Sequence, residues 1–158
     1  MTPEDQQKAL DNLLRGSLSP FAQKVFHQLN PGKRFFDGWY LDAMTHRLER
    51  CRTGSCKRLI ITAPPRYLKS IVTSVAYPAF LLGRNPTERI LCISYGNELA
   101  LSHARDFRSV VSSAWYRQVF PQTVALRDVE DLFETNRMDF VEPGHLRVHK
   151  RDLARTQS

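Results

Sequence analysis

The stretch Arg58-Leu59-Ile60-Ile61-Thr62-Ala63-Pro64-Pro65-Arg66-Tyr67-Leu68-Lys69-Ser70 decides which fold the sequence predicts. Its first half is a compact apolar run rich in β-branched residues, and it follows the breaker Thr53-Gly54-Ser55, so it predicts a short buried strand. The two prolines fix φ and remove two backbone donors, so a helix cannot start there. Helical spacing resumes over residues 70–82. The stretch therefore predicts a strand, a tight loop and a helix in direct succession.

The flanking segments continue this alternation. Upstream, apolar residues three and four positions apart predict helices over residues 3–15, 20–29 and 39–50. Downstream, the apolar run at residues 89–95 predicts a second buried strand, and Asn97 is expected to cap a helix that ends near residue 112. Buried strands that alternate with helices indicate an α/β fold, in which helices flank a parallel sheet.

These patterns divide the chain into three expected parts. Residues 1–35 form an N-terminal helical segment, residues 36–121 an α/β domain, and residues 122–158 an irregular basic tail. The tail shows no clean period. A poorly ordered, solvated end is the favoured interpretation, and a DNA-binding arm is the alternative.

Lys69 and Ser70 stand where a phosphate-binding loop carries its last two residues, between the expected strand and the expected helix. In such a loop, backbone N–H groups at a helix N-terminus point at the anion, the lysine contacts the terminal phosphates, and the hydroxyl binds Mg²⁺. The standard pattern has two glycines, at the positions that Ala63 and Leu68 occupy here. The alternative is a surface loop whose lysine is solvated.

The stretch over residues 58–70 closely resembles the Walker A region of the large terminase subunits of tailed phages and prophages, which carry Pro-Pro-Arg before Lys-Ser. The resemblance covers about residues 20–121. Its other blocks follow in the family's order: residues 39–50, residues 79–86, residues 89–95 with Glu98-Leu99-Ala100, and Trp115-Tyr116 with Phe120-Pro121.

The resemblance implies a P-loop NTPase-like parallel sheet, here incomplete, and a role in ATP-driven translocation of DNA into a capsid. Lys69 would contact the β- and γ-phosphates, and Ser70 would bind the Mg²⁺ that accompanies the nucleotide. Arg66 is similar to the family's loop arginine, which stabilises charge at the γ-phosphate, so Arg66 and Lys69 are the expected catalytic residues. A surface arginine that pairs with a carboxylate is the alternative for Arg66. The full expected ATP-binding set is Pro64, Pro65, Arg66, Tyr67, Leu68, Lys69 and Ser70.

Phosphoryl transfer also needs an acidic residue at the end of another apolar strand. The acids at Asp128, at Glu130-Asp131 and within residues 138–142 follow no suitable strand pattern, and no nuclease motif is present. We therefore expect a truncated or frame-shifted terminase fragment that binds ATP and Mg²⁺ without being fully catalytic. The implied partners are double-stranded DNA, the small terminase subunit and the portal protein.

The net charge of +7 favours an anionic partner but does not identify it. Two alternatives to the ATPase fragment stay open: a non-catalytic basic module that binds DNA or a protein partner, and a non-functional prophage remnant with an open sheet edge.

Two smaller features have two interpretations each. Cys51, Cys56 and His46 could form a metal site, but no second Cys/His pair has ligand spacing, so reduced thiols are favoured. Trp39 or Tyr40 could stack on adenine, and packing in the core is favoured.

The sequence contains no apolar run of the ~20 residues that cross a bilayer. The first residues lack a basic region followed by an apolar one. We expect no membrane association and a location in the cytoplasm of a bacterial host.

Overall fold

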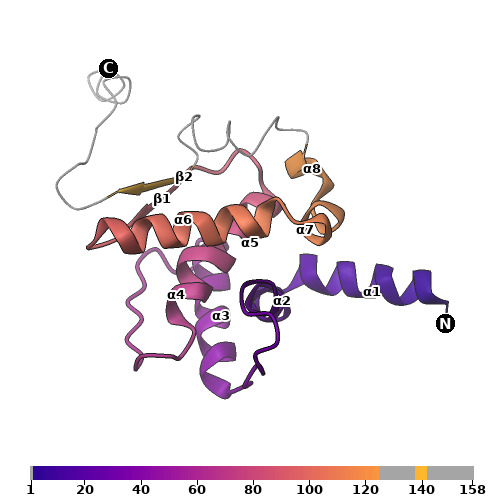
Figure 1. The fold of residues 1–158 in the computed structure, drawn as a ribbon, viewed down its shortest axis with the longest axis horizontal. Helices are drawn as coiled ribbons and strands as arrows, with labels where there is room; N and C mark the ends of the chain where they lie inside the picture. Colours follow the sequence, from indigo (N-terminus) through magenta and orange to yellow (C-terminus); the bar gives the residue numbers. More distant parts are fainter. Residues whose placement is uncertain (1, 125–137, 142–158) are drawn as a thin grey trace.

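A computed structural model describes residues 2–124 and 138–141 of the chain (Figure 1). The N-terminal half contains α1 (Pro3–Gly16), α2 (Leu18–Leu29) and α3 (Trp39–Arg52). A continuous helical run follows, made of α4 (Lys69–Ile71), the π-helical turn η1 (Val72–Ala76) and α5 (Tyr77–Arg84). The remaining elements are β1 (Ile90–Ile93), α6 (Asn97–Val111), α7 (Ala114–Val119), α8 (Pro121–Val124) and β2 (Met138–Val141).

The prediction of an α/β fold, with a P-loop NTPase-like parallel sheet flanked by helices, is wrong. The described residues are mostly helical. Their only strand pairing is short and parallel: β1 lies beside β2, with Ile90 opposite Met138 and Ile93 opposite Val141. The expected first strand over residues 58–63 forms no ladder among the described residues. A strand is defined by backbone hydrogen bonds to a neighbouring strand, and the pairing seen among the described residues joins β1 to β2, not to residues 58–63.

The predicted helices are confirmed, with small shifts at their ends. α1 begins with a capping box, in which the Asp5 backbone N–H donates to Thr2 Oγ1 at 3.2 Å and the Thr2 N–H donates to the Asp5 carboxylate at 2.9 Å. Pro3 occupies the first helical position, where the missing N–H costs nothing. Asn97 differs from the expectation: it is the first residue of α6, and Gly96 is the N-cap, with no side-chain cap.

One hydrophobic core holds these helices together. Phe21 of α2 lies at its centre, with ring centroids 5.4 Å from Phe80, 5.6 Å from Trp115 and 5.8 Å from Phe120. The Tyr116 hydroxyl is buried and donates to the Ala79 carbonyl at 2.8 Å, which fixes α7 against α5. Burial of rings of this size is the dominant favourable contribution to folding.

The N-terminal helices share this core with the later ones. Leu14 of α1 and Leu18 of α2 belong to the same buried cluster as Val75, Phe107 and Phe120. Figure 1 shows the rest of α1 projecting away from the molecule. Residues 1–35 are therefore joined to residues 36–121 by packing. Of the expected tail over residues 122–158, only residues 122–124 and β2 fall within the described ranges.

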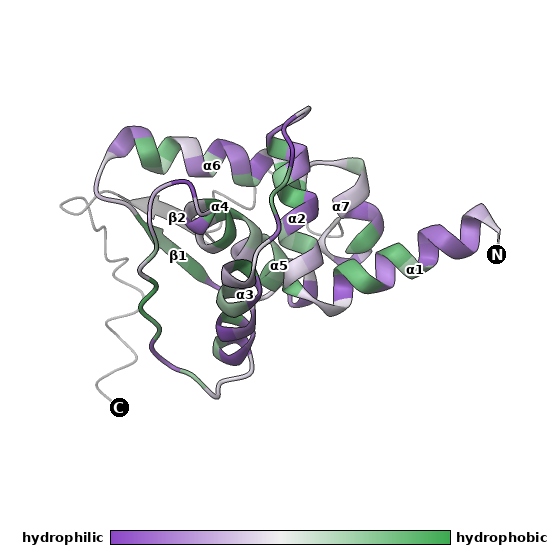
Figure 2. Ribbon diagram, turned by 90° about the horizontal axis from the view of Figure 1, so that it is seen from below, coloured by the Kyte–Doolittle hydropathy of each residue, from purple (hydrophilic) through white to green (hydrophobic). Residues whose placement is uncertain are grey.

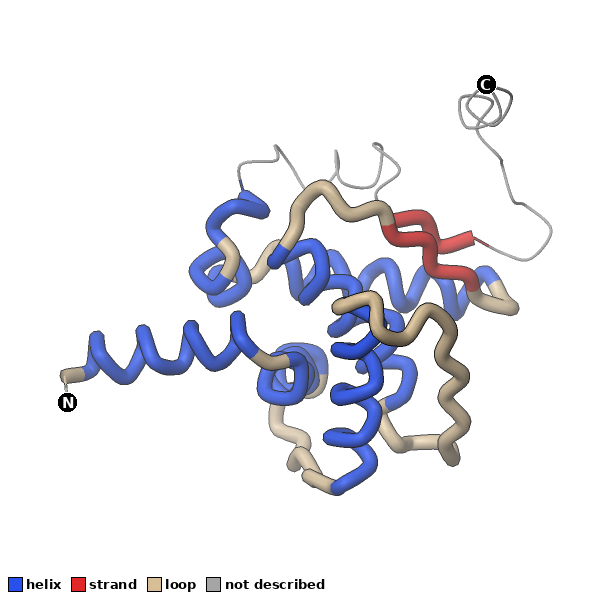
Figure 3. Tube along the Cα trace, turned by 180° about the vertical axis from the view of Figure 1, so that it is seen from behind, coloured by secondary structure: helices blue, strands red, loops and turns tan. Residues whose placement is uncertain are grey.

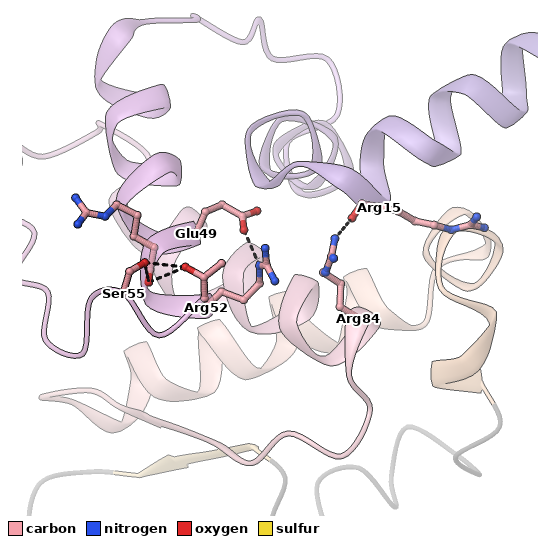
Figure 4. A network of polar contacts seen from close by, with 7 residues as sticks. Arg15, Glu49, Arg52, Ser55 and Arg84 are labelled. Carbon is pink, nitrogen blue, oxygen red and sulfur yellow. Dashed lines mark hydrogen bonds and ion pairs between the residues drawn. The ribbon is translucent and has the colours of Figure 1, made fainter.

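Polar contacts close the ends of several helices (Figure 4). The Arg84 guanidinium donates to the Arg15 carbonyl at 2.6 Å, and Arg15 itself donates to the carbonyls of Val119 and, at 3.2 Å, Gln118. These arginines satisfy the carbonyls that helix C-termini leave unpaired. The Glu49–Arg52 ion pair on α3, at 2.6 Å, is partly exposed, so it contributes at most ~1 kcal/mol.

Within residues 2–124 and 138–141, no helix combines the length and the apolar character that a bilayer-spanning helix requires.

Candidate phosphate-binding loop

The loop between the extended segment and α4 has a conformation that is unusual for its residues. Arg66 has φ of 71° and Leu68 has φ of 56°, both in the left-handed region. This region costs an L-residue about 1–2 kcal/mol, and glycine reaches it freely. Leu68 occupies the position where the standard phosphate loop has its second glycine, so the backbone keeps a glycine-like conformation that the sequence had not indicated.

Lys69 lies at the start of the helical run and folds back across the loop. Its Nζ donates to the Ala63 carbonyl at 3.3 Å, and its side chain is half-buried. The loop is therefore closed by a charge-assisted contact between its two ends. Lys69 is also the first residue of α4, and the first backbone N–H groups of a helix have no partner within the helix.

A π-helical turn interrupts the run immediately after this first turn. η1 covers Val72–Ala76, and Thr73 Oγ1 donates to the Lys69 carbonyl at 2.8 Å. π-Helical turns occur mostly as single turns inside α-helices and are frequent at functional sites. Here the turn lies beside the cavity that Lys69 and Ser70 line.

That cavity has a volume of about 420 Å³ and joins the helix start to the end of β1. Five of the described residues that line it carry a hydroxyl: Ser70, Thr73 and Ser74 on the helical run, and Ser94 and Tyr95 after β1. Its apolar wall comes from α3, the extended segment and the region around β1. The described residues that line it are Leu48, Leu59, Ile61, Lys69, Ser70, Thr73, Ser74, Ile93, Ser94, Tyr95, Leu99 and His103.

The predicted site residues divide into two groups. Lys69 and Ser70 line the cavity, with Ser70 exposed to solvent. Pro64, Pro65, Arg66, Tyr67 and Leu68 lie outside its lining. Arg66 is exposed, so in this structure the expected catalytic arginine does not converge with Lys69 on the cavity.

Of the two aromatic residues near the loop, Trp39 departs from the favoured interpretation as a core residue, whereas Tyr40 packs against the core. Trp39 is 82% exposed, so it does not pack in the core. Tyr40 is half-buried at the core margin and meets Tyr67 of the loop edge to face, with ring centroids 4.8 Å apart. This contact attaches the middle of the loop to α3.

Sequence reasoning missed the cavity residues that come from outside the loop. Thr73 and Ser74 lie one helical turn beyond Lys69 and Ser70, so helical periodicity alone could have placed them on the same face. Ser94, Tyr95 and His103 could not be found in that way, because only tertiary packing brings β1 and α6 to the loop. Burial lowers the pKa of His103 below its usual 6.5, and the charge of Asp106 opposes this shift.

The interpretation of His46, Cys51 and Cys56 as a metal site gains no support. Within the described ranges, no group of three or more His, Cys, Asp or Glu side chains is placed to hold a metal ion. Burial raises the pKa of the Cys51 thiol, and a hydrogen bond with Cys56 adds to the effect. Both thiols are free of disulfides.

Comparison with known proteins adds no relative: no protein-family model, no curated protein and no solved structure matches this chain.

Proposed function

We propose that the loop over residues 63–70 binds the phosphates of ATP with Mg²⁺, and that the chain serves DNA packaging as a fragment of a terminase-type ATPase in the cytoplasm of a bacterial host. The observation that carries the proposal is the Lys69–Ser70 pair at the mouth of a hydroxyl-rich cavity, after a loop with two left-handed residues. The proposal rests on this local geometry and on the resemblance of residues 58–70 to Walker A regions.

The charge pattern around the loop supports an anionic ligand. Every charged residue from Arg50 to Lys69 is basic, and none of the described residues that line the cavity is a carboxylate. The Lys69 ammonium donates one hydrogen bond to a neutral carbonyl, that of Ala63, at 3.3 Å. A phosphate oxygen at the same place would give a shorter and stronger charge-assisted bond, so an anion would displace the Ala63 contact at little cost.

The size of the cavity suits part of a nucleotide. Pockets for small molecules and cofactors measure roughly 300–1,000 Å³, and this cavity measures about 420 Å³. In this proposal the phosphates lie at Lys69, and Ser70 or Thr73 contributes a hydroxyl to Mg²⁺. Mg²⁺ usually keeps several waters and takes few protein ligands besides substrate phosphates, so one hydroxyl suffices.

The proposed activity is the binding of ATP, and we expect ATP hydrolysis to be weak. Phosphoryl transfer needs a carboxylate to hold Mg²⁺ and another group to position the attacking water. None of the described residues lining the cavity is acidic. Arg66 is exposed and would have to move toward the γ-phosphate to stabilise charge in the transition state. Double-stranded DNA, a small terminase subunit and a portal protein remain the proposed partners.

The test compares the affinity of the wild-type protein and Lys69→Ala for a fluorescent ATP analogue with Mg²⁺. Loss of a hydrogen bond to a charged group costs about 1.5–3 kcal/mol, so we expect the affinity to fall at least tenfold. Lys57→Ala is the matched control, because Lys57 is an exposed lysine that precedes the extended segment and is not among the described residues that line the cavity. Equal affinity for the wild type and Lys69→Ala would refute the phosphate site.

The same variants separate the proposal from a basic binding module. That module predicts salt-sensitive binding of double-stranded DNA that is equal in Lys69→Ala and Lys57→Ala. DNA binding with no measurable binding of the ATP analogue would support the module instead of the ATPase fragment.

A further inference from the structure

The extended segment before the loop has the surface pattern of a strand without a neighbouring strand. Leu59, Ile61 and Ala63 are half-buried, while Arg58, Ile60 and Thr62 between them are exposed. Leu59 and Ile61 pack against the hydrophobic core, and Ile60 is 90% exposed on the opposite side. Alternation with a period of two is the signature of a strand whose one face is covered.

The backbone of this segment has no strand partner within the described residues. Two of its carbonyls accept hydrogen bonds from side chains: Lys69 Nζ donates to the Ala63 carbonyl at 3.3 Å, and Cys56 Sγ donates to the Arg58 carbonyl at 3.3 Å. Figure 3 shows the segment as a drawn-out path along the outside of the helices, and Figure 2 colours part of it as strongly hydrophobic. An exposed, extended and apolar edge of this kind is a template for pairing with another strand.

We propose that residues 58–63 form a docking edge for an extended, apolar peptide segment of another polypeptide whose ends carry acidic residues. Backbone hydrogen bonds would supply the affinity, as in other cases of strand addition, and the exposed Ile60 side chain would be covered by an apolar residue of the partner. β1 contributes Ile93 to the cavity that Leu59 and Ile61 line, and its Leu91 and Ile93 side chains, 53% and 52% exposed, offer further apolar surface. This inference does not depend on nucleotide binding.

The basic residues at both ends of the docking edge favour a partner with acidic ends. Lys57 and Arg58 lie at the start of the docking edge and Arg66 follows its end, with no acidic residue between Glu49 and Glu88. A second copy of this chain would bring the same basic ends to the pairing, and like charges placed opposite each other across strands are destabilising. A partner with acidic ends gains attraction at both ends, so it is favoured over self-pairing.

The unpaired backbone and the exposed isoleucine favour a peptide over a nucleic acid. A nucleic acid would be attracted by the same basic residues but would leave the backbone N–H and C=O groups of residues 58–63 unused and Ile60 uncovered.

The experiment uses the full chain and a fluorescein-labelled synthetic peptide of alternating valine and threonine with glutamate at both ends. We expect saturable binding by fluorescence anisotropy, together with slower amide exchange at residues 58–63. A peptide with proline at its centre, which cannot donate to a ladder, should bind at least tenfold more weakly. This control leaves the protein unchanged.

Three protein variants test the docking edge itself, two at Ile60 and one at Arg58. Ile60→Pro should weaken peptide binding at least tenfold, and Ile60→Thr, which keeps the backbone donor, should bind within about threefold of wild type. Because Ile60 is 90% exposed, both variants should unfold thermally like the wild type. Arg58→Glu should weaken binding of the glutamate-ended peptide and strengthen binding of a lysine-ended one.

Several results would overturn the proposal: no peptide binding, equal binding of the proline-containing peptide, or equal binding by Ile60→Pro. Concentration-dependent dimerisation that Ile60→Pro abolishes would assign the edge to a second copy. Peptide displacement by a single-stranded oligonucleotide that binds Ile60→Pro equally well would assign it to nucleic acid. Peptide binding that persists in Lys69→Ala, together with loss of ATP-analogue binding, would keep the docking edge separate from the nucleotide site.

Discussion

At the scale of single residues, the loop stores strain at Arg66 and Leu68. A left-handed backbone costs about 1–2 kcal/mol in an L-residue and persists only where the surroundings enforce it. Here the hydrogen bond from Lys69 to Ala63 joins the two ends of the loop. The ring contact between Tyr67 and Tyr40 holds the middle of the loop against α3. Conformational strain concentrates at ligand-binding sites, so its presence next to Lys69 is consistent with the proposed phosphate loop.

Arg66→Gly should relieve strain at an exposed position. Glycine adopts φ of 71° without a steric penalty, although it also gains freedom in the unfolded chain, so we expect the free energy of unfolding to rise by up to about 1 kcal/mol. Urea unfolding measures this change. Arg58→Gly is the matched control, because Arg58 is exposed but lacks a positive φ, and there we expect equal or lower stability. A drop in stability in Arg66→Gly would argue against the left-handed conformation.

At the scale of elements, Gly83 allows α5 to pack closely against Phe120, the residue that follows α7. Gly83 is buried in α5, and a Cβ at this position would lie inside the van der Waals contact distance of the Phe120 ring. Phe120 is 4% exposed and packs against Phe21, so its ring has little room to move. The glycine thus allows helices that are distant in sequence to approach.

Gly83→Ala should therefore destabilise the protein, although alanine is the better helix former. Alanine gains about 1 kcal/mol of helix propensity, while overpacking costs about 1–3 kcal/mol, so we expect a net loss of roughly 1 kcal/mol and a melting temperature lower by a few degrees. Gly16→Ala, where nothing lies within 4 Å of the added Cβ, should be neutral or stabilising. Thermal unfolding followed by circular dichroism compares the two, and equal effects would contradict the packing argument.

At the scale of the whole molecule, His103 couples stability to pH, because α6 is packed over the cavity. Burial lowers the pKa of His103 below 6.5. The unfolded chain therefore takes up this proton at higher pH than the folded chain does. Stability is fully retained above pH 6.5 and is lost as the pH falls through 6.5 toward the folded pKa.

We expect the melting temperature of the ligand-free protein to fall between about pH 7 and about pH 5, and His103→Gln to reduce this dependence. His46→Gln is the control, since His46 lies exposed on α3. Burial raises the pKa of Asp106 above 3.8, which acts in the opposite direction at more acidic pH, so the comparison stays above about pH 5. If the melting temperature of His103→Gln depends on pH as strongly as that of the wild type, His103 is not the group responsible.

The helices could be predicted from the sequence, because their signals are local. Residues 3–15, 20–29 and 39–50 carry apolar residues at helical spacing, and each became a helix within two residues of the expected ends. The start of a helix at Lys69 and Ser70 could also be predicted from the sequence, because the two prolines before them prevent the helix from beginning earlier.

Tertiary structure decided the rest. An apolar, β-branched run predicts a strand, but whether it pairs depends on distant segments, and residues 58–63 found no partner in the described chain while residues 90–93 did. The left-handed conformation of Leu68 and the arrival of Ser94 and His103 at the cavity also arise from packing between elements. Local spacing fixes which residues turn into helix, whereas hydrogen-bonded ladders and cavities exist only between segments that the folded chain brings together.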